Sequence, residues 1–105
     1  MLNPEKAFEK IKLNTNNSDF FLLDLRSPEK VSASKFGDSL HLDYNDESFD
    51  DELEKLDRNK IYFVFCTRGL KSSIAVEMME DLGFKEVYGL AGGLIAWQKK
   101  GYKLF

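Results

Sequence analysis

Residues 61–72 have the sequence Ile-Tyr-Phe-Val-Phe-Cys-Thr-Arg-Gly-Leu-Lys-Ser. The apolar run Ile61–Phe65 predicts a strand that is buried on both faces, as in a parallel sheet. The strand continues directly into Cys66, a short loop with Gly69 follows, and apolar residues at helical spacing indicate a helix from Lys71. Ligands of open parallel sheets bind beyond the carboxyl ends of the strands, so this segment predicts a functional site at the cysteine.

Strand and helix signals alternate along the rest of the chain. Apolar runs predict further strands at Phe20–Leu25, Ser39–Leu42 and Glu86–Tyr88. Caps, prolines and helical spacing predict helices at Pro4–Leu13, after a capping Ser27, at Asp43–Asp57, from Lys71 to Gly83, and between Gly93 and Gly101. In the fourth helix, the residues expected to face inward are Ile74, Ala75, Met78, Met79 and Leu82. The alternation predicts an α/β fold in which helices cover both faces of an open, mostly parallel sheet.

The composition excludes several classes of protein. The 105 residues fit a single domain, and 43% hydrophobic residues provide a core for it. The net charge is -3 and acids and bases are interspersed, so no basic stripe indicates a nucleic-acid partner. The longest apolar run, Ile61–Cys66, is too short to cross a bilayer, and we expect no membrane partner.

Cysteine and histidine counts narrow the chemistry further. Cys66 is the only cysteine and His41 the only histidine, which excludes an internal disulfide and predicts that the protein holds no metal or other cofactor. A lone thiol is best preserved in a reducing compartment, so we expect a cytoplasmic protein. We expect His41 to be packed or on the surface rather than paired with the cysteine.

The cysteine itself has two possible roles. Free cysteines are most often small, inert, buried residues. A loop that joins a strand to a helix can instead point several backbone N–H groups at one sulfur atom and stabilise its negative charge. Arg68 and Lys71 add positive charge nearby, and Gly69 allows a tight curl. This context favours a nucleophile at Cys66.

Three blocks of sequence resemble one known family. Residues 66–72 are similar to the active-site loop of rhodanese-like domains, and Leu22–Glu29 resembles the family segment LLDVRxPxE. Residues 82–97 resemble its LGFxxVxxLxGGxxxW segment. The blocks occur in the family's order and spacing over roughly Phe20–Gly101. The resemblance implies one rhodanese-like domain, residues 1–105, whose open, mostly parallel sheet has five strands.

The resemblance also implies a sulfurtransferase. Cys66 would take the outer sulfur of thiosulfate or a similar small anionic donor, hold it as a persulfide, and pass it to a small thiol, a protein thiol or cyanide. The loop would cradle the persulfide by stabilising its charge, and the loop cations would attract the donor. The expected cradle consists of Thr67, Arg68, Gly69, Leu70, Lys71 and Ser72.

A second segment, at the end of the first strand, has supporting residues. In the family it lies beside the active-site loop, so Asp24 is expected to support that loop and Arg26 to lie partly near the site. The favoured alternative is a purely structural role, in which Asp24 accepts bonds from loop N–H groups and Arg26 pairs with Glu29, three residues on.

Two positions depart from the family pattern. Lys35 occupies the usual position of a histidine, so the local turn is expected to differ. Lys71 occupies a position where many members have arginine, and lysine makes no planar bidentate contact. A catalytically quiet module that binds or regulates a protein therefore stays open. Phosphatase or arsenate reductase chemistry is disfavoured, because those relatives have five residues between cysteine and an arginine, whereas four separate Cys66 from Lys71.

Overall fold

Four parallel strands form one sheet in the computed structural model, which describes residues 1–103. The strands are β1 (Phe20–Asp24), β2 (Leu40–His41), β3 (Ile61–Phe65) and β4 (Glu86–Gly89), in the spatial order β2-β1-β3-β4. Five helices accompany them: α1 (Pro4–Leu13), α2 (Pro28–Ala33), α3 (Phe49–Glu54), α4 (Leu70–Asp81) and α5 (Gly93–Lys99). The prediction of an α/β fold with a parallel sheet is confirmed.

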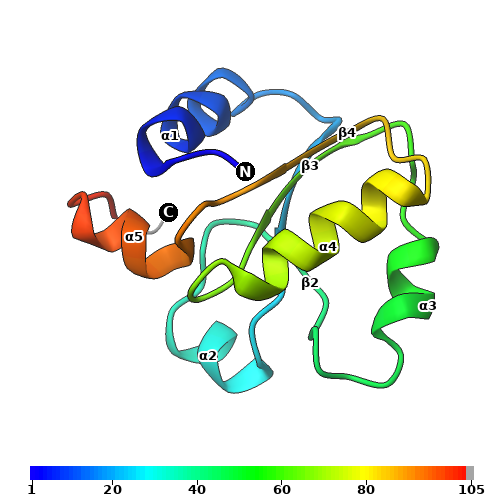
Figure 1. Cartoon of the computed structure of the whole chain (residues 1–105). Helices are drawn as coiled ribbons and strands as arrows, with labels where there is room; N and C mark the ends of the chain where they lie inside the picture. Colours follow the sequence, from blue (N-terminus) through cyan, green and yellow to red (C-terminus); the bar gives the residue numbers. More distant parts are fainter. Residues whose placement is uncertain (104–105) are drawn as a thin grey trace.

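The central strand β3 separates two hydrophobic cores. Tyr62, Val64 and Cys66 belong to the core that α3 and α4 close, while Phe63 and Phe65 belong to the core closed by α1 and α5. This alternation follows from the two-residue period of a strand. Figure 1 shows α1 and α5 on one side of the strands and α3 and α4 on the other, so the prediction that helices cover both faces is confirmed.

The expected fifth strand is wrong for the described part of the chain, where the sheet has four strands. Next to the end of β4, Leu2 makes a single isolated bridge to Leu90. The chain then turns into α1 at once, because the Asn3 side chain accepts a bond from the Lys6 N–H and Pro4 takes the first helical position. A helix that begins two residues after the bridge leaves no length for a strand.

The acidic segment 43–57 is helical over a shorter stretch than predicted, since α3 covers only six residues. Two aspartates fold the preceding residues into turns. Asp43 Oδ1 accepts a bond of 3.0 Å from the Asn45 N–H, and Asp46 Oδ2 accepts one of 3.0 Å from the Ser48 N–H. Such side-chain bonds compete with the helical hydrogen bonds of the backbone.

The inner face of α4 is also rotated from the prediction. Ile74 was expected inside and is 48% exposed. The buried residues of this helix are Ser72, Ala75, Val76 and Met79. The difference arises because a polar residue, Ser72, lies in the buried stripe, where a pattern based on apolar residues does not find it.

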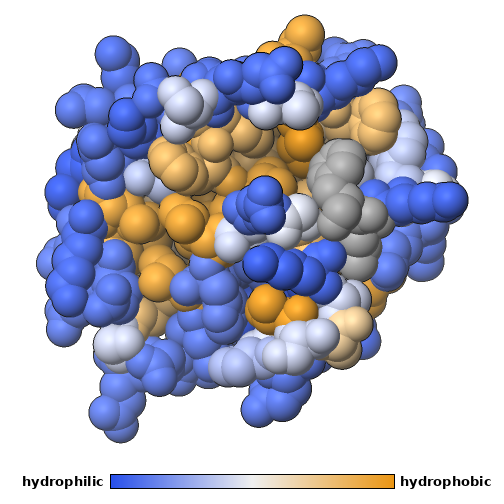
Figure 2. Space-filling view, turned by 180° about the vertical axis from the view of Figure 1, so that it is seen from behind, coloured by the Kyte–Doolittle hydropathy of each residue, from blue (hydrophilic) through white to orange (hydrophobic). Residues whose placement is uncertain are grey.

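The rear face of the molecule shows apolar surface gathered in its middle within a polar rim (Figure 2). Strand β2 pairs only with the last two residues of β1, Leu23 and Asp24. A groove of about 350 Å³ contains the apolar residues Ile11, Phe20, Phe21 and Leu22.

Within residues 1–103, no helix has the length and apolar character that crossing a bilayer requires.

Candidate active site

The sulfur of Cys66 lies at the carboxyl end of β3, inside the curl of the loop that leads into α4. Its Sγ accepts hydrogen bonds from the backbone N–H of Gly69 at 3.1 Å and of Ser72 at 3.4 Å. The Ser72 hydroxyl oxygen is 3.5 Å from the sulfur and donates to the Gly69 carbonyl at 3.2 Å. The two N–H groups directed at one sulfur form an environment that stabilises negative charge there, and the Cys66 thiol can donate to the Ser72 oxygen.

Gly69 makes the curl possible in two ways. Its φ of +92° lies in the left-handed region, and a Cβ at this position would lie 2.9 Å from the backbone nitrogen of Gly92. The predicted need for glycine in the loop is therefore confirmed. Helix α4 begins at Leu70, one residue earlier than predicted, so the Ser72 N–H belongs to the first turn of the helix and is free to face the sulfur.

The N-terminus of α5 holds the first part of the loop. The Leu94 N–H donates to the Cys66 carbonyl at 3.0 Å, and the Ile95 N–H donates to the Thr67 carbonyl at 3.1 Å. Gly93 permits this close approach, because a Cβ there would overlap the Thr67 carbonyl. The N–H groups of Leu94 and Ile95 thus hold the backbone that carries the cysteine, and Gly93 leaves room for them to do so.

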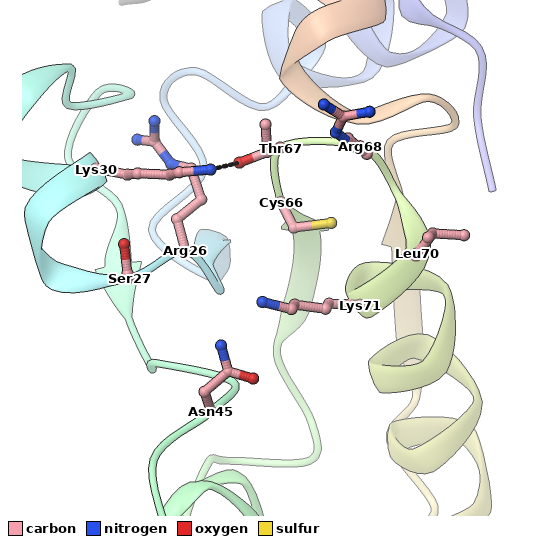
Figure 3. A pocket seen from close by; sticks show the side chains of 9 residues that line it. All are labelled: Arg26, Ser27, Lys30, Asn45, Cys66, Thr67, Arg68, Leu70 and Lys71. Carbon is pink, nitrogen blue, oxygen red and sulfur yellow. Dashed lines mark hydrogen bonds between the residues drawn. The ribbon is translucent and has the colours of Figure 1, made fainter.

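A cleft of about 410 Å³ opens over the sulfur, and Figure 3 shows the side chains around it. Cys66 is only 4% exposed, so reactants reach it through this cleft. Among the described residues that line the cleft, four are cationic and none is acidic. The lining consists of Arg26, Ser27, Lys30, Asn45, Cys66, Thr67, Arg68, Leu70 and Lys71. Such a concentration of positive charge attracts anions.

The cations occupy different parts of the cleft. Figure 3 shows the Lys71 ammonium directed into it, and the ammonium lies 5.9 Å from the Tyr44 ring centre. Lys30 reaches from α2 on the opposite wall and donates to the Thr67 hydroxyl at 3.4 Å. Arg68 is exposed and points away from the sulfur at the outer rim. The structure thus brings Lys71 into the cleft and leaves Arg68 at its edge.

Arg26 lies in the wall as part of a buried ion pair. Its Nη2 is 2.9 Å from Asp24 Oδ2, with side-chain exposures of 5% and 1%. Asp24 also accepts from the Arg26 backbone N–H at 3.0 Å, and Arg26 donates to the hydroxyl and carbonyl of Ser34. The alternative pairing with Glu29 is wrong, because Asp24 is the partner. The pair stabilises the turn after β1, and the uncompensated charge of the cleft comes from the other three cations.

Sequence reasoning missed Lys30, Ser27 and Asn45 as cleft residues. Strands β1 and β3 are neighbours, so the segments that follow them face each other, and this adjacency could have identified Lys30 and Ser27. Ser27 does occupy the predicted capping position of α2, but its side chain makes no capping bond. Asn45 comes from an irregular segment that no periodic signal reveals.

The lone histidine lies on the surface, as expected, and does not line the cleft. His41 Nε2 donates to the Arg26 carbonyl at 2.7 Å, and the residue is exposed. The divergent segment that contains Lys35 contacts the ion pair through Ser34, while Lys35 itself is exposed.

Comparisons with known proteins found a matching family, similar sequences and a similar structure. The family described as "Rhodanese-like domain" matches residues 7–100. The chain is 35% identical over 85 residues to the tRNA uridine(34) hydroxylase of Pelagibacter ubique, covering 80% of this chain and 28% of that longer protein. It is 29% identical over 93 residues to the thiosulfate sulfurtransferase GlpE of Coxiella burnetii, covering 89% and 81%. A crystal structure of a rhodanese-related protein from Thermoplasma volcanium superposes with a TM-score of 0.81 at 26% identity, covering 99% and 95%.

Proposed function

The chain belongs to the rhodanese-like domain family, and we propose that it is a sulfurtransferase that carries sulfane sulfur as a persulfide on Cys66. One observation carries this proposal: the N–H groups of Gly69 and Ser72 meet at the single thiol, on the floor of a cationic cleft. The name of the GlpE relative adds thiosulfate as a donor to consider.

The first half of the reaction loads the sulfur. The Cys66 thiolate attacks the outer sulfur of thiosulfate, the bond between the two donor sulfurs breaks, and sulfite leaves with the bonding electron pair. Lys71, directed into the cleft, offsets the repulsion between the thiolate and the dianion. The two N–H groups stabilise the charge of the persulfide, as an oxyanion hole does for oxygen.

The second half of the reaction transfers the sulfur from Cys66 to an acceptor. An acceptor thiolate or cyanide attacks the outer sulfur of the persulfide, the S–S bond breaks, and Cys66 leaves as a thiolate that the same two N–H groups stabilise. Cys66 is the only cysteine, so no second thiol of this chain can resolve the persulfide. A reducing compartment such as the cytoplasm supplies thiol acceptors and keeps the free thiol reduced.

The alternatives fit the site less well. A phosphatase or arsenate reductase loop places an arginine around a tetrahedral oxyanion, whereas here Ser72 packs against the sulfur and the arginine of the loop, Arg68, points outward. A quiet binding module has no use for N–H groups aimed at a buried thiol. Neither alternative is favoured by an observation of its own.

Steady-state turnover tests the proposal. The purified protein is expected to form thiocyanate from thiosulfate and cyanide with ping-pong kinetics, and Cys66→Ser is expected to form none. Lys71→Met should raise the KM for thiosulfate about three- to tenfold, because a cleft cation is lost. Lys12→Met, an exposed change on α1, is the matched control and should leave KM unchanged.

Turnover that survives in Cys66→Ser would contradict the proposed nucleophile. Absence of transfer from every sulfane donor tried, including thiosulfate and an organic persulfide, would contradict the proposed activity.

A further inference from the structure

Two large apolar side chains of α4 are exposed beside the cleft. Leu70 is 74% exposed and Ile74 is 48% exposed. They are four residues apart on one helix, so they form a continuous apolar surface. The large apolar side chains exposed within residues 1–103 are Met1, Leu13, Leu40, Leu70 and Ile74, and these two are the ones that share a helix turn. Leu70 also lines the cleft, which connects this surface to the reactive sulfur.

The packing of α4 does not require this apolar surface. The helix contacts the sheet through a stripe that includes Ala75, Val76 and Met79. In its first half the pattern is inverted, because the polar Ser72 is buried and Ile74 faces solvent. Ser72 is explained by its contacts with the sulfur. The outward apolar side chains have no comparable role inside the fold, which points to a partner outside it.

Charge changes sign along the same helix. Arg68 and Lys71 lie at its cysteine end, whereas Glu77, Glu80 and Asp81 lie in its second half, where all three are exposed. An acidic partner is therefore attracted to the end beside the sulfur and repelled from the other end. The arrangement selects both the sign of the partner's charge and its position.

From this juxtaposition we infer that α4 provides the docking surface for a protein acceptor. The surface consists of Leu70 and Ile74 together with the cations at the cysteine end of the helix, Arg68 and Lys71. The reactive cysteine of the acceptor is flanked by apolar and acidic residues. The inference rests on the proposed function, since a persulfide on the only cysteine must be discharged onto another molecule. A small thiol would need the cleft alone, and Ile74 lies outside the lining of the cleft. Ile74 therefore distinguishes a protein acceptor from a small one.

The transfer itself requires close approach. The acceptor thiolate attacks the outer sulfur of the persulfide, the S–S bond to Sγ breaks, and the moved sulfur remains on the acceptor as its new persulfide. Electrons and charge balance without a further oxidant or reductant. Because Cys66 is 4% exposed, the acceptor's cysteine must protrude on an extended segment that enters the cleft while its neighbours lie on α4.

Peptide acceptors test the inference. The protein is loaded with thiosulfate, persulfide formation is verified by intact mass, and the sulfur is then offered to three synthetic single-cysteine peptides. The first has leucine and glutamate beside the cysteine, the second has lysine in place of glutamate, and the third has serine in place of leucine. Transfer to the first is expected to be about tenfold faster than to the second at low salt, with the difference shrinking at high salt.

The decisive variant is Ile74→Ser. It should slow transfer to the leucine–glutamate peptide about five- to tenfold, because apolar contact is lost, and should leave discharge to cyanide and to glutathione unchanged. Leu13→Ser, which removes a side chain that is 84% exposed on α1, is the matched control and should change neither rate. Equal rates for the three peptides, or an Ile74→Ser protein as fast as the wild type, would overturn the docking surface. Failure to load the persulfide at all would overturn the proposed function, and it is seen before any peptide is added.

Discussion

Gly93 offers a sharp test of how the fold positions the cysteine. Its φ is +66°, and a Cβ would overlap the Thr67 carbonyl and lie 2.6 Å from the Arg68 nitrogen. These are backbone atoms of the cysteine loop, so Gly93→Ala must displace either the loop or the start of α5. Either movement weakens the bond from Leu94 N–H to the Cys66 carbonyl.

The expected cost of Gly93→Ala has two parts. A left-handed conformation costs a non-glycine residue about 1–2 kcal/mol, and overpacking adds about 1–3 kcal/mol. The variant should therefore unfold with a free energy lower by about 2–5 kcal/mol, which leaves most domains of this kind folded. A displacement of the loop by about 1 Å should lower the sulfur-transfer rate about a hundredfold.

Gly83→Ala is the matched control. Gly83 has a φ of +87°, and a Cβ there meets nothing within 4 Å, so the variant carries the backbone strain without the overlap. It should lose about 1–2 kcal/mol and keep its transfer rate. The assays are chemical denaturation and thiocyanate formation below the unfolding transition. A folded Gly93→Ala protein with wild-type activity would refute the claim that α5 positions the cysteine loop.

Three further changes have defined outcomes. Arg26→Met leaves Asp24 charged and buried, so denaturation should show a loss of about 3–5 kcal/mol. Ser72→Ala removes the hydroxyl beside the Cys66 sulfur, and thiocyanate assays should show turnover about tenfold slower. Burial raises the pKa of Tyr62 above its ordinary value of 10.0, so the folded state binds that proton more tightly, and the resulting stability is present below about pH 10 and lost as the pH rises through the raised pKa. Tyr62→Phe should flatten this alkaline loss in a denaturation series that starts below about pH 10 and rises above it.

Controls separate these effects from general damage. Arg68→Met, at an exposed position, should change the free energy of unfolding by less than about 0.5 kcal/mol, and an equal loss in both arginine variants would contradict the buried-pair argument. Ser73→Ala is the matched control and should leave turnover unchanged. Unchanged turnover in Ser72→Ala would show that the Ser72 hydroxyl does not contribute to sulfur transfer. An alkaline stability loss that is as steep in Tyr62→Phe as in the wild type would show that this phenol does not titrate with unfolding.

Local signals predicted the elements whose ends are set by their own residues. The helix Pro4–Leu13 and the strand Ile61–Phe65 have the predicted bounds, because a cap with proline fixes the first and an unbroken apolar run fixes the second. The helix at 43–57 was overestimated, since helical spacing does not register aspartates that bond to nearby N–H groups. The prediction of a fifth strand is wrong, because the described residues add only one isolated bridge, at Leu2, to the four-stranded sheet.

The residues of the candidate site also fall into two groups, those that the local sequence predicts and those that only the fold brings together. Cys66, Gly69 and Ser72 come from one continuous segment, so spacing was enough to group them. Lys30 and Asn45 reach the cleft from other elements, and only the three-dimensional arrangement of the neighbouring segments brings them there. The same arrangement directs the Lys71 side chain into the cleft and the Arg68 side chain away from it, which a sequence pattern does not contain.

The central claim is that Cys66 holds a persulfide, and intact mass spectrometry tests it most directly. The reduced protein is incubated with thiosulfate, separated from it and weighed, with Cys66→Ser treated in parallel. We predict that the wild-type mass rises by one sulfur atom, that cyanide removes the added mass, and that the variant gains nothing. An unchanged wild-type mass with thiosulfate and with an organic persulfide, or the same gain in Cys66→Ser, would contradict the claim.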